Sequence, residues 1–181
     1  MPEPLVVHGL GAAWFTVLVL CVGGERIAEL YLARRHRRWA MAHGGIEFGS
    51  GHYGWIVAVQ LVLLVGSLVE SWARRPQADA RIFVPMIIIV LAAQSLRWWC
   101  IRTLGRQWNT RVIVIPGAER VVGGPYRWLR HPNYLAVVVE GAALPLAGGA
   151  WTTAIVVCLA HLLIIPTRIR VENRALRRLR S

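Results

Sequence analysis

The chain has 181 residues, 56% of them hydrophobic, and a formal net charge of +12 at pH 7. A soluble domain of this length is about 45–50% apolar, whereas here the apolar residues gather into long runs almost without charge, which is typical of transmembrane helices. Every basic residue is arginine and lies between or beside these runs, so the charge favours a membrane surface over a nucleic-acid partner. The three cysteines stand singly, without a C-x-x-C spacing, and predict neither a metal site nor a disulfide framework.

Five apolar runs predict an all-α integral membrane protein with about five transmembrane helices in one domain. The first run has no basic residue before it, the opposite of a cleaved signal peptide, so we expect a retained helix. The charged stretch Glu25–Met41 follows without a breaker and predicts a helix that continues into water or along the interface. Gly148-Gly149 makes a tight turn, so the last two spans form a helical hairpin. The predicted spans are residues 5–24, 55–72, 82–101, 134–150 and 151–166.

The polar segments lie mainly on one side of the predicted membrane. Arg111–Ile115 is a short β-type run closed by Pro116-Gly117, and predicts a small hairpin or an extended loop on the membrane surface. The arginine-rich tail, residues 167–181, predicts an amphipathic helix. Of the 21 basic residues, all but Arg74, Arg75 and Arg81 fall on one side. By the positive-inside rule that side is cytoplasmic and the N-terminus lies outside.

The segment Gly124–Tyr134, between the third and fourth spans, is the strongest candidate for chemistry. Pro132 suits the first turn of a helix, which would aim free backbone N–H groups at the preceding loop and favour an anion there. Arg130 and His131 stand at that helix start. Arg127 and Trp128 are better interpreted as anchors to lipid headgroups.

Two carboxylates stand out in apolar or arginine-rich surroundings. Glu172 is the one acidic residue of the tail, and either pairs with Arg168 or accepts hydrogen bonds from a cofactor hydroxyl or ammonium. Glu140 lies inside the fourth span, where carboxylates are usually functional or paired. It either pairs with an arginine from a neighbouring helix end or takes part in substrate binding. Polar residues within the other spans, Gln60, Gln94 and His161, favour hydrogen bonds between helices.

These motifs resemble the signature of the isoprenylcysteine carboxyl methyltransferase superfamily of membrane enzymes. That signature pairs a GPY…RHPxY loop, here Gly124-Pro125-Tyr126 and Arg130–Tyr134, with a tail motif of the form R-x-x-E-E. Asn173 stands where the family usually has its second glutamate. Leu104–Trp108 resembles the lead-in to the loop, and the similarity runs from about Ile101 to the C-terminus. The N-terminal half, with Glu25–Leu30, Gly44-Gly45 and His52-Tyr53, looks more like the small bacterial branch that methylates hydroxyls of alkylpyrones and phenolic lipids.

The resemblance implies S-adenosylmethionine as methyl donor, bound on the cytosolic face, and a lipophilic acceptor that enters from the bilayer. A cation near an ionised hydroxyl would hold its anion. We therefore expect Arg130, Arg168 and Glu172 to be catalytic. The cofactor would contact Gly124, Pro125, Tyr126, His131, Pro132, Tyr134, Glu172 and Asn173. The acceptor would contact Arg106, Trp108, Asn109 and Glu140.

Other interpretations stay open at this point. Sterol-type reductases that use NADPH share a related C-terminal architecture, and a non-catalytic membrane scaffold is a third reading. The asparagine at position 173 counts against a carboxylate acceptor such as prenylcysteine. The expected location is a bacterial inner membrane, with membrane lipids as neighbours.

Overall fold

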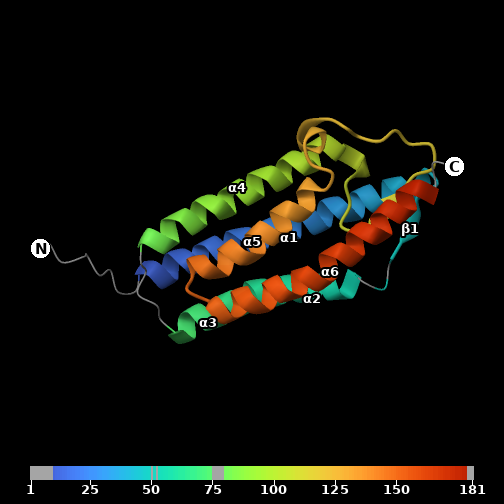
Figure 1. Cartoon of the computed structure of the whole chain (residues 1–181). Helices are drawn as coiled ribbons and strands as arrows, with labels where there is room; N and C mark the ends of the chain where they lie inside the picture. The colour runs from blue at the N-terminus through green and yellow to red at the C-terminus, as the bar shows by residue number, and fades with distance from the viewer. Residues whose placement is uncertain (1–9, 50, 52, 75–79, 179–181) are drawn as a thin grey trace, which may run out of the picture.

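The computed structural model describes residues 10–49, 51, 53–74 and 80–178. The start of the first predicted span, most of the linker around Pro76 and the last three residues of the tail lie outside this description. Figure 1 shows the helices side by side along a common direction. They are α1 (Leu10–Ala42), α2 (Tyr53–Leu61) continued by a π-helical turn (Val62–Gly66) and α3 (Ser67–Arg74), α4 (Ala80–Leu104), α5 (Pro132–Ala147) and α6 (Trp151–Arg178).

The chain is an all-α membrane protein, as the sequence predicts. Among the described residues, three helical stretches are long and apolar enough to cross a membrane: Tyr53–Arg74, Arg81–Gln107 and Trp151–Arg177. α5 is a shorter apolar helix. Large apolar side chains on the outer surfaces, such as Leu163 at 75% exposure, suit contact with lipid. That α1 and α5 also cross the membrane remains a prediction.

The charged part of α1 differs from expectation. The helix is continuous, but Arg26 and Glu29 do not face water or the interface, since they are 7% and 2% exposed. Arg26 donates hydrogen bonds to Glu29, to Gln94 of α4 and to Glu140 of α5. Charged side chains can be buried in an apolar bundle when oppositely charged or polar groups pair with them there. The pattern of apolar residues along one helix does not show which residues of other helices form those pairs.

The predicted helical hairpin is present as α5 and α6, joined by a short turn. A side chain at position 148 would collide with the ring of Phe15, whose nearest atom would lie 2.3 Å from an added Cβ. The carboxylate of Glu70 caps α6 by accepting hydrogen bonds from the backbone of Thr152 and Thr153. α6 continues through Pro166 to Arg178, so the last predicted span and most of the amphipathic tail form one helix.

Of the two predictions for residues 111–117, a small hairpin or an extended loop, the structure contains an extended segment and no local hairpin. β2 (Val112–Val114) pairs antiparallel with β1 (Ile46–Phe48), which lies between α1 and α2. Val112 opposes Phe48, so the partner strand is distant in sequence and the local turn signal did not disclose it. Figure 1 places β1, the long loop before α5 and the end of α6 at the same end of the bundle.

Glu47 of β1 holds this small sheet to its surroundings. Its carboxylate accepts hydrogen bonds from Arg37 of α1, at 3.0 Å, and from Arg111, at 2.5 Å. Burial acts to raise the pKa of Glu47, but the hydrogen bonds from the two guanidinium groups outweigh it, so the pKa lies below its usual range. Two segments far apart in sequence are thereby clamped at the end of the bundle.

Candidate functional site

A cavity of about 510 Å³ lies at this end of the bundle, between α2, α5, α6 and the segment that follows α4. Its volume is within the range of about 300–1,000 Å³ found for small-molecule sites. Among the residues expected to bind or react, the cavity lining includes Arg106, Trp108, Asn109, Tyr126, Arg130, His131, Tyr134, Arg168 and Glu172. Gly124, Pro125, Pro132, Glu140 and Asn173 are not part of the lining.

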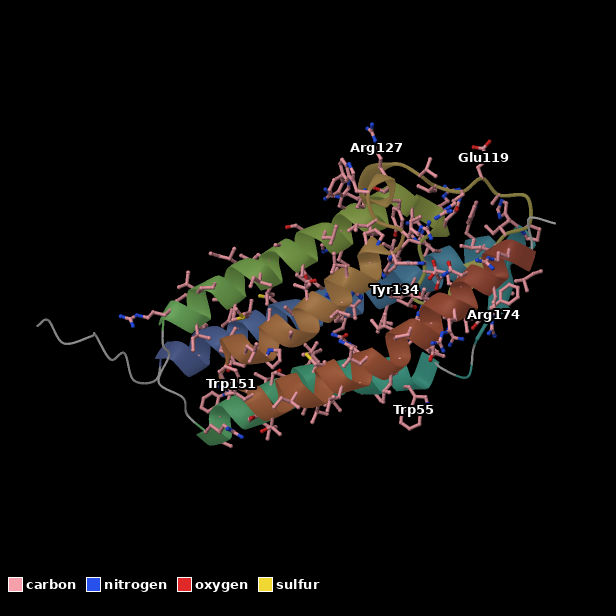
Figure 2. The ribbon with its side chains drawn as sticks, in the orientation of Figure 1. Trp55, Glu119, Arg127, Tyr134, Trp151 and Arg174 are labelled. Carbon is pink, nitrogen blue, oxygen red and sulfur yellow. The ribbon has the colours of Figure 1, made fainter. Side chains whose placement is uncertain are left out.

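The loop motif and the tail motif meet at one wall of the cavity. The hydroxyl of Tyr134 donates a hydrogen bond of 2.6 Å to Glu172, and Arg168 Nε donates to the same hydroxyl at 3.1 Å. Arg168 also donates to the carbonyl oxygen of Thr110. Figure 2 shows Tyr134 among the helices, whereas Arg127 and Glu119 project outward from the loop. The tail carboxylate is therefore linked to Arg168 through a tyrosine hydroxyl.

The polar end of α5 lies beside this wall. His131 Nδ1 is 3.8 Å from Glu172 Oε1. α5 begins at Pro132, as predicted, but the backbone N–H groups of Tyr134 and Leu135 donate to the carbonyl oxygen of His131, so only the N–H of Asn133 is left at the helix start. The side-chain oxygen of Asn133 is buried and lacks a hydrogen-bond partner among the described residues, and Arg130 has no ion pair there. This helix start thus combines an arginine, a histidine and an unsatisfied acceptor, a setting that suits a charged ligand.

Residues of the loop that do not line the cavity shape its backbone instead. Gly124 has a φ of 53°, and an added Cβ would lie 2.4 Å from Thr103 Oγ1, so a side chain is excluded here. Pro125 is buried within a short 3-10 turn (Gly124–Arg127). That turn presents Tyr126 to the cavity, and burial raises the pKa of its hydroxyl well above the usual range. Tyr126 is therefore a neutral donor at the pH of a cell.

The N-terminal half contributes more contacts to the cavity region than expected. From the sequence, we expected the loop before α5 to contact the C-terminal tail and not α1. His36 of α1 contacts the carbonyl oxygen of Trp108 at 2.8 Å, and Asn109 donates to the carbonyl of Ala33 at 3.2 Å. α1 thereby holds the lead-in segment over the cavity. Trp108 is 2% exposed and packs in a small core cluster with Ala33 and Ile101.

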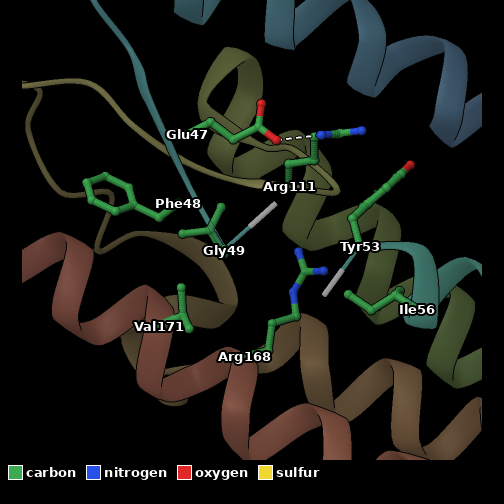
Figure 3. A pocket seen from close by; sticks show the side chains of 9 residues that line it. Glu47, Phe48, Gly49, Tyr53, Ile56, Arg111, Arg168 and Val171 are labelled. Carbon is green, nitrogen blue, oxygen red and sulfur yellow. Dashed lines mark hydrogen bonds and ion pairs between the residues drawn. The ribbon is translucent and has the colours of Figure 1, made fainter. Parts of the chain in front are cut away.

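A narrow pocket between the sheet and α6 joins the same region (Figure 3). In Figure 3 the ion pair of Glu47 with Arg111 lies near Tyr53, with Arg168 beside them. The guanidinium of Arg111 lies 4.2 Å from the centre of the Tyr53 ring, a cation–π contact. Sequence reasoning missed Arg111 as a cavity residue. It stands just after Asn109, but its place depends on the pairing of β1 with β2.

Glu140 is buried away from the cavity lining, at 1% exposure. Arg26 donates to its carboxylate at 3.0 Å, and Arg97 Nη1 lies 3.9 Å from the same oxygen. Pairing with arginines, one of the two alternatives for this residue, is what the structure contains. The Arg26–Glu29–Arg97–Glu140 group is called the buried ion cluster below.

Positive charge dominates the cavity. Six arginines line it, against two glutamates, Glu119 and Glu172. Two of the arginines already have carboxylate partners, Arg97 with Glu29 and Arg111 with Glu47. The remaining excess favours a ligand that carries negative charge or many acceptor oxygens. Within the described ranges, no three His, Cys, Asp or Glu side chains gather as a metal site would require.

Comparisons with known proteins agree with these motifs. A model of the isoprenylcysteine carboxyl methyltransferase family matches residues 86–178, just over half of the chain. The uncharacterized protein YpbQ of Bacillus subtilis (strain 168) is 32% identical over 163 residues, covering 90% of this chain and 95% of the relative. An uncharacterized protein of Haemophilus influenzae is 23% identical over 164 residues, with the same two coverages. No solved structure matches the chain significantly.

Proposed function

Because the chain belongs to the isoprenylcysteine carboxyl methyltransferase family, we propose that it transfers a methyl group from S-adenosylmethionine to an oxygen of a lipophilic acceptor. The observation that carries the proposal is the meeting of Tyr134 with Glu172, at 2.6 Å, on the wall of the cavity. Two motifs separated by most of the α5–α6 hairpin thus come into contact there. Such convergence of polar groups on a cavity is the usual mark of a ligand site.

The residues present fit the proposed cofactor. Its ammonium and ribose hydroxyls need acceptors, which Glu172 and the unpartnered oxygen of Asn133 supply. Its carboxylate needs donors, which the guanidinium of Arg130 and the backbone N–H of Asn133 supply. The negative charge of Glu172 also offsets part of the positive lining, which would otherwise oppose a cationic cofactor.

When bound, S-adenosylmethionine supplies a methyl group on a sulfonium; a new C–O bond forms as the C–S bond breaks and its electron pair stays on sulfur. The chain's task is then to align the acceptor oxygen and to hold it as an anion. Arginines in the lining, Arg106 and Arg168, favour the ionised acceptor and so reduce the need for a strong base. Alignment of the two reactants in the cavity supplies most of the rate enhancement expected for such a transfer.

The acceptor we favour is a long-chain alkylpyrone or phenolic lipid with an acidic hydroxyl. The part of the cavity between α2 and α6 is lined by apolar side chains that suit an alkyl tail, namely Ile56, Val59, Ile164 and Ile165. Its polar, arginine-lined part suits the ring. We further propose a bacterial inner membrane with the cavity on the cytoplasmic side, since the arginine-rich segments lie at the cavity end.

The test uses the purified full-length chain in lipid nanodiscs. We expect S-adenosylhomocysteine, and not NADPH, to bind in calorimetry and to raise the unfolding temperature. We also expect radioactive methyl groups to pass from S-adenosylmethionine to a long-chain alkyl hydroxypyrone. Binding of NADPH alone would favour a reductase, and binding of neither would favour a scaffold. Methylation of S-farnesylated cysteine but not of the hydroxypyrone would overturn the acceptor class.

A further inference from the structure

The peptide unit between Thr110 and Arg111 is held at both of its polar groups. Its carbonyl oxygen, on Thr110, accepts a hydrogen bond from the guanidinium of Arg168. Its N–H group, on Arg111, donates at 3.1 Å to the side-chain oxygen of Asn109. A trans peptide is planar and its C=O and N–H groups point in opposite directions, so an acceptor that fixes the N–H also fixes the carbonyl. The side chain of Asn109 therefore sets where the acceptor for Arg168 lies.

Asn109 is itself anchored to the N-terminal helix. Its side-chain nitrogen donates at 3.2 Å to the carbonyl oxygen of Ala33, a buried residue of α1 that packs against Trp108. Because one atom of the carboxamide binds α1 and the other binds the backbone of Arg111, the group cannot rotate without losing both hydrogen bonds. The support for the Thr110–Arg111 peptide thus comes from outside the segment 86–178 that the family model matches.

Arg168 carries this support to the wall of the cavity. An arginine side chain has many rotamers, and the hydrogen bond to the Thr110 carbonyl selects one of them. In that rotamer, Nε donates at 3.1 Å to the hydroxyl of Tyr134. The same hydroxyl donates at 2.6 Å to Glu172. A continuous series of hydrogen bonds therefore runs from α1 to the carboxylate of the tail motif.

We propose that Asn109 is a positioning residue for the cofactor site, rather than the contact for the acceptor that the sequence predicts. It acts through the Thr110 carbonyl on Arg168, which in turn orients the Tyr134 hydroxyl. The inference rests on the proposed function, which puts the cofactor at the wall formed by Tyr134 and Glu172. Asn109 reaches the cavity lining, but its oxygen and its nitrogen are both bound to backbone groups of the protein. Its loss should weaken cofactor binding while Arg168 is present, and have no further effect once Arg168 is removed.

The test is a double-mutant cycle on the full-length chain in nanodiscs, with affinity for S-adenosylhomocysteine measured by calorimetry. This probe lacks the sulfonium charge, so the loss of an arginine charge changes its binding less than that of S-adenosylmethionine. We expect Asn109→Ala to weaken binding about threefold and Arg168→Met about fivefold, the scale of one hydrogen bond each. The double variant should bind as Arg168→Met does, because the two residues act through one another. Losses that multiply in the double variant would show that Asn109 contacts the ligand on its own, and would overturn the proposal.

Two further variants separate positioning from a general loosening of the segment. Gln107→Ala removes a neighbouring carboxamide that donates at 3.3 Å to the carbonyl of Glu119, away from the hydrogen bonds that lead to Glu172. It should keep the wild-type affinity. Asn109→Ser keeps an oxygen that can accept from the Arg111 N–H, and should recover part of the affinity that Asn109→Ala loses. An equal loss in Gln107→Ala, or no recovery in Asn109→Ser, would overturn the positioning role.

Asn109→Gln replaces Asn109→Ala in the cycle if the alanine variant does not fold. It keeps a polar amide, but the added methylene moves the oxygen away from the Arg111 N–H, so we expect the same threefold loss. If the wild type binds no S-adenosylhomocysteine, the proposed function and the positioning role both fail. If the wild type binds it and Asn109→Gln binds it equally well, only the positioning role fails.

Discussion

Two of the arginine–glutamate groups in this molecule look alike in sequence and differ in structure. At the cavity wall, the side chain of Glu172 is 31% exposed and meets a tyrosine hydroxyl and a histidine. In the buried ion cluster, the side chains of Glu29 and Glu140 are 3% and 2% exposed and meet arginines. A carboxylate that reaches the cavity can bind a ligand, whereas one enclosed by guanidinium groups holds helices together. The distinction depends on access, which residue type does not reveal.

The largest effect is expected from the removal of Glu140, which tests whether the buried ion cluster holds the helices together. We expect Glu140→Ala to destabilise the fold by about 3–5 kcal/mol, because two buried arginines lose a partner. Thermal unfolding in nanodiscs measures the effect. Glu140→Gln, which keeps an acceptor of similar size, should cost less. A stable Glu140→Ala protein that has lost methyl transfer would instead return this residue to the substrate site.

Removal of the Glu172 carboxylate should weaken ligand binding and leave the stability of the fold nearly unchanged. We expect Glu172→Gln to weaken S-adenosylhomocysteine binding by about 1.5–3 kcal/mol, the range for hydrogen bonds to a charged group, with little change in unfolding temperature. Isothermal calorimetry measures the affinity. Glu119→Gln is the matched control, since Glu119 also lines the cavity but lies on the exposed outer loop. Equal losses in both variants would point to general electrostatics rather than to direct contact.

The tyrosine that joins the two motifs offers a finer test. Tyr134→Phe removes the hydroxyl between Glu172 and Arg168 but keeps the ring. We expect about fivefold weaker cofactor binding, the scale of one hydrogen bond of about 1 kcal/mol. Tyr31→Phe, on the exposed face of α1, serves as control. An unchanged affinity would show that the hydroxyl is dispensable and that Glu172 is placed by other contacts.

The smallest expected effect concerns the sheet. Because the folded-state pKa of Glu47 lies below the ordinary value of 4.5, its ion pairs contribute stability above that pH. The contribution is lost as the pH falls through the folded-state pKa. We expect the unfolding temperature of the wild type to fall more steeply on acidification than that of Glu47→Gln. Parallel curves for the two proteins would show that the clamp adds no stability.

Much of the site could be predicted because its residues lie in two short motifs. Arg130, His131, Tyr134, Arg168 and Glu172 were all chosen from sequence, and the structure brings them to one cavity. Their roles in binding and catalysis stay predictions. We expected cofactor contacts from Gly124, Pro125 and Pro132 because these residues belong to the motif. In the structure they determine the course of the backbone, in the 3-10 turn and at the start of α5.

Sequence alone determined the membrane class, the helical hairpin and the two motifs, because apolar run length, glycine turns and local spacing are properties of neighbouring residues. Only the tertiary structure decided that β1 pairs with β2, that Arg26 and Glu29 turn inward, and that Arg97 pairs with Glu29 in the buried ion cluster. Each of these depends on a partner from another helix or strand. The positions of these polar groups depend on contacts between helices or strands, and the sequence of one segment does not show which other segment it contacts.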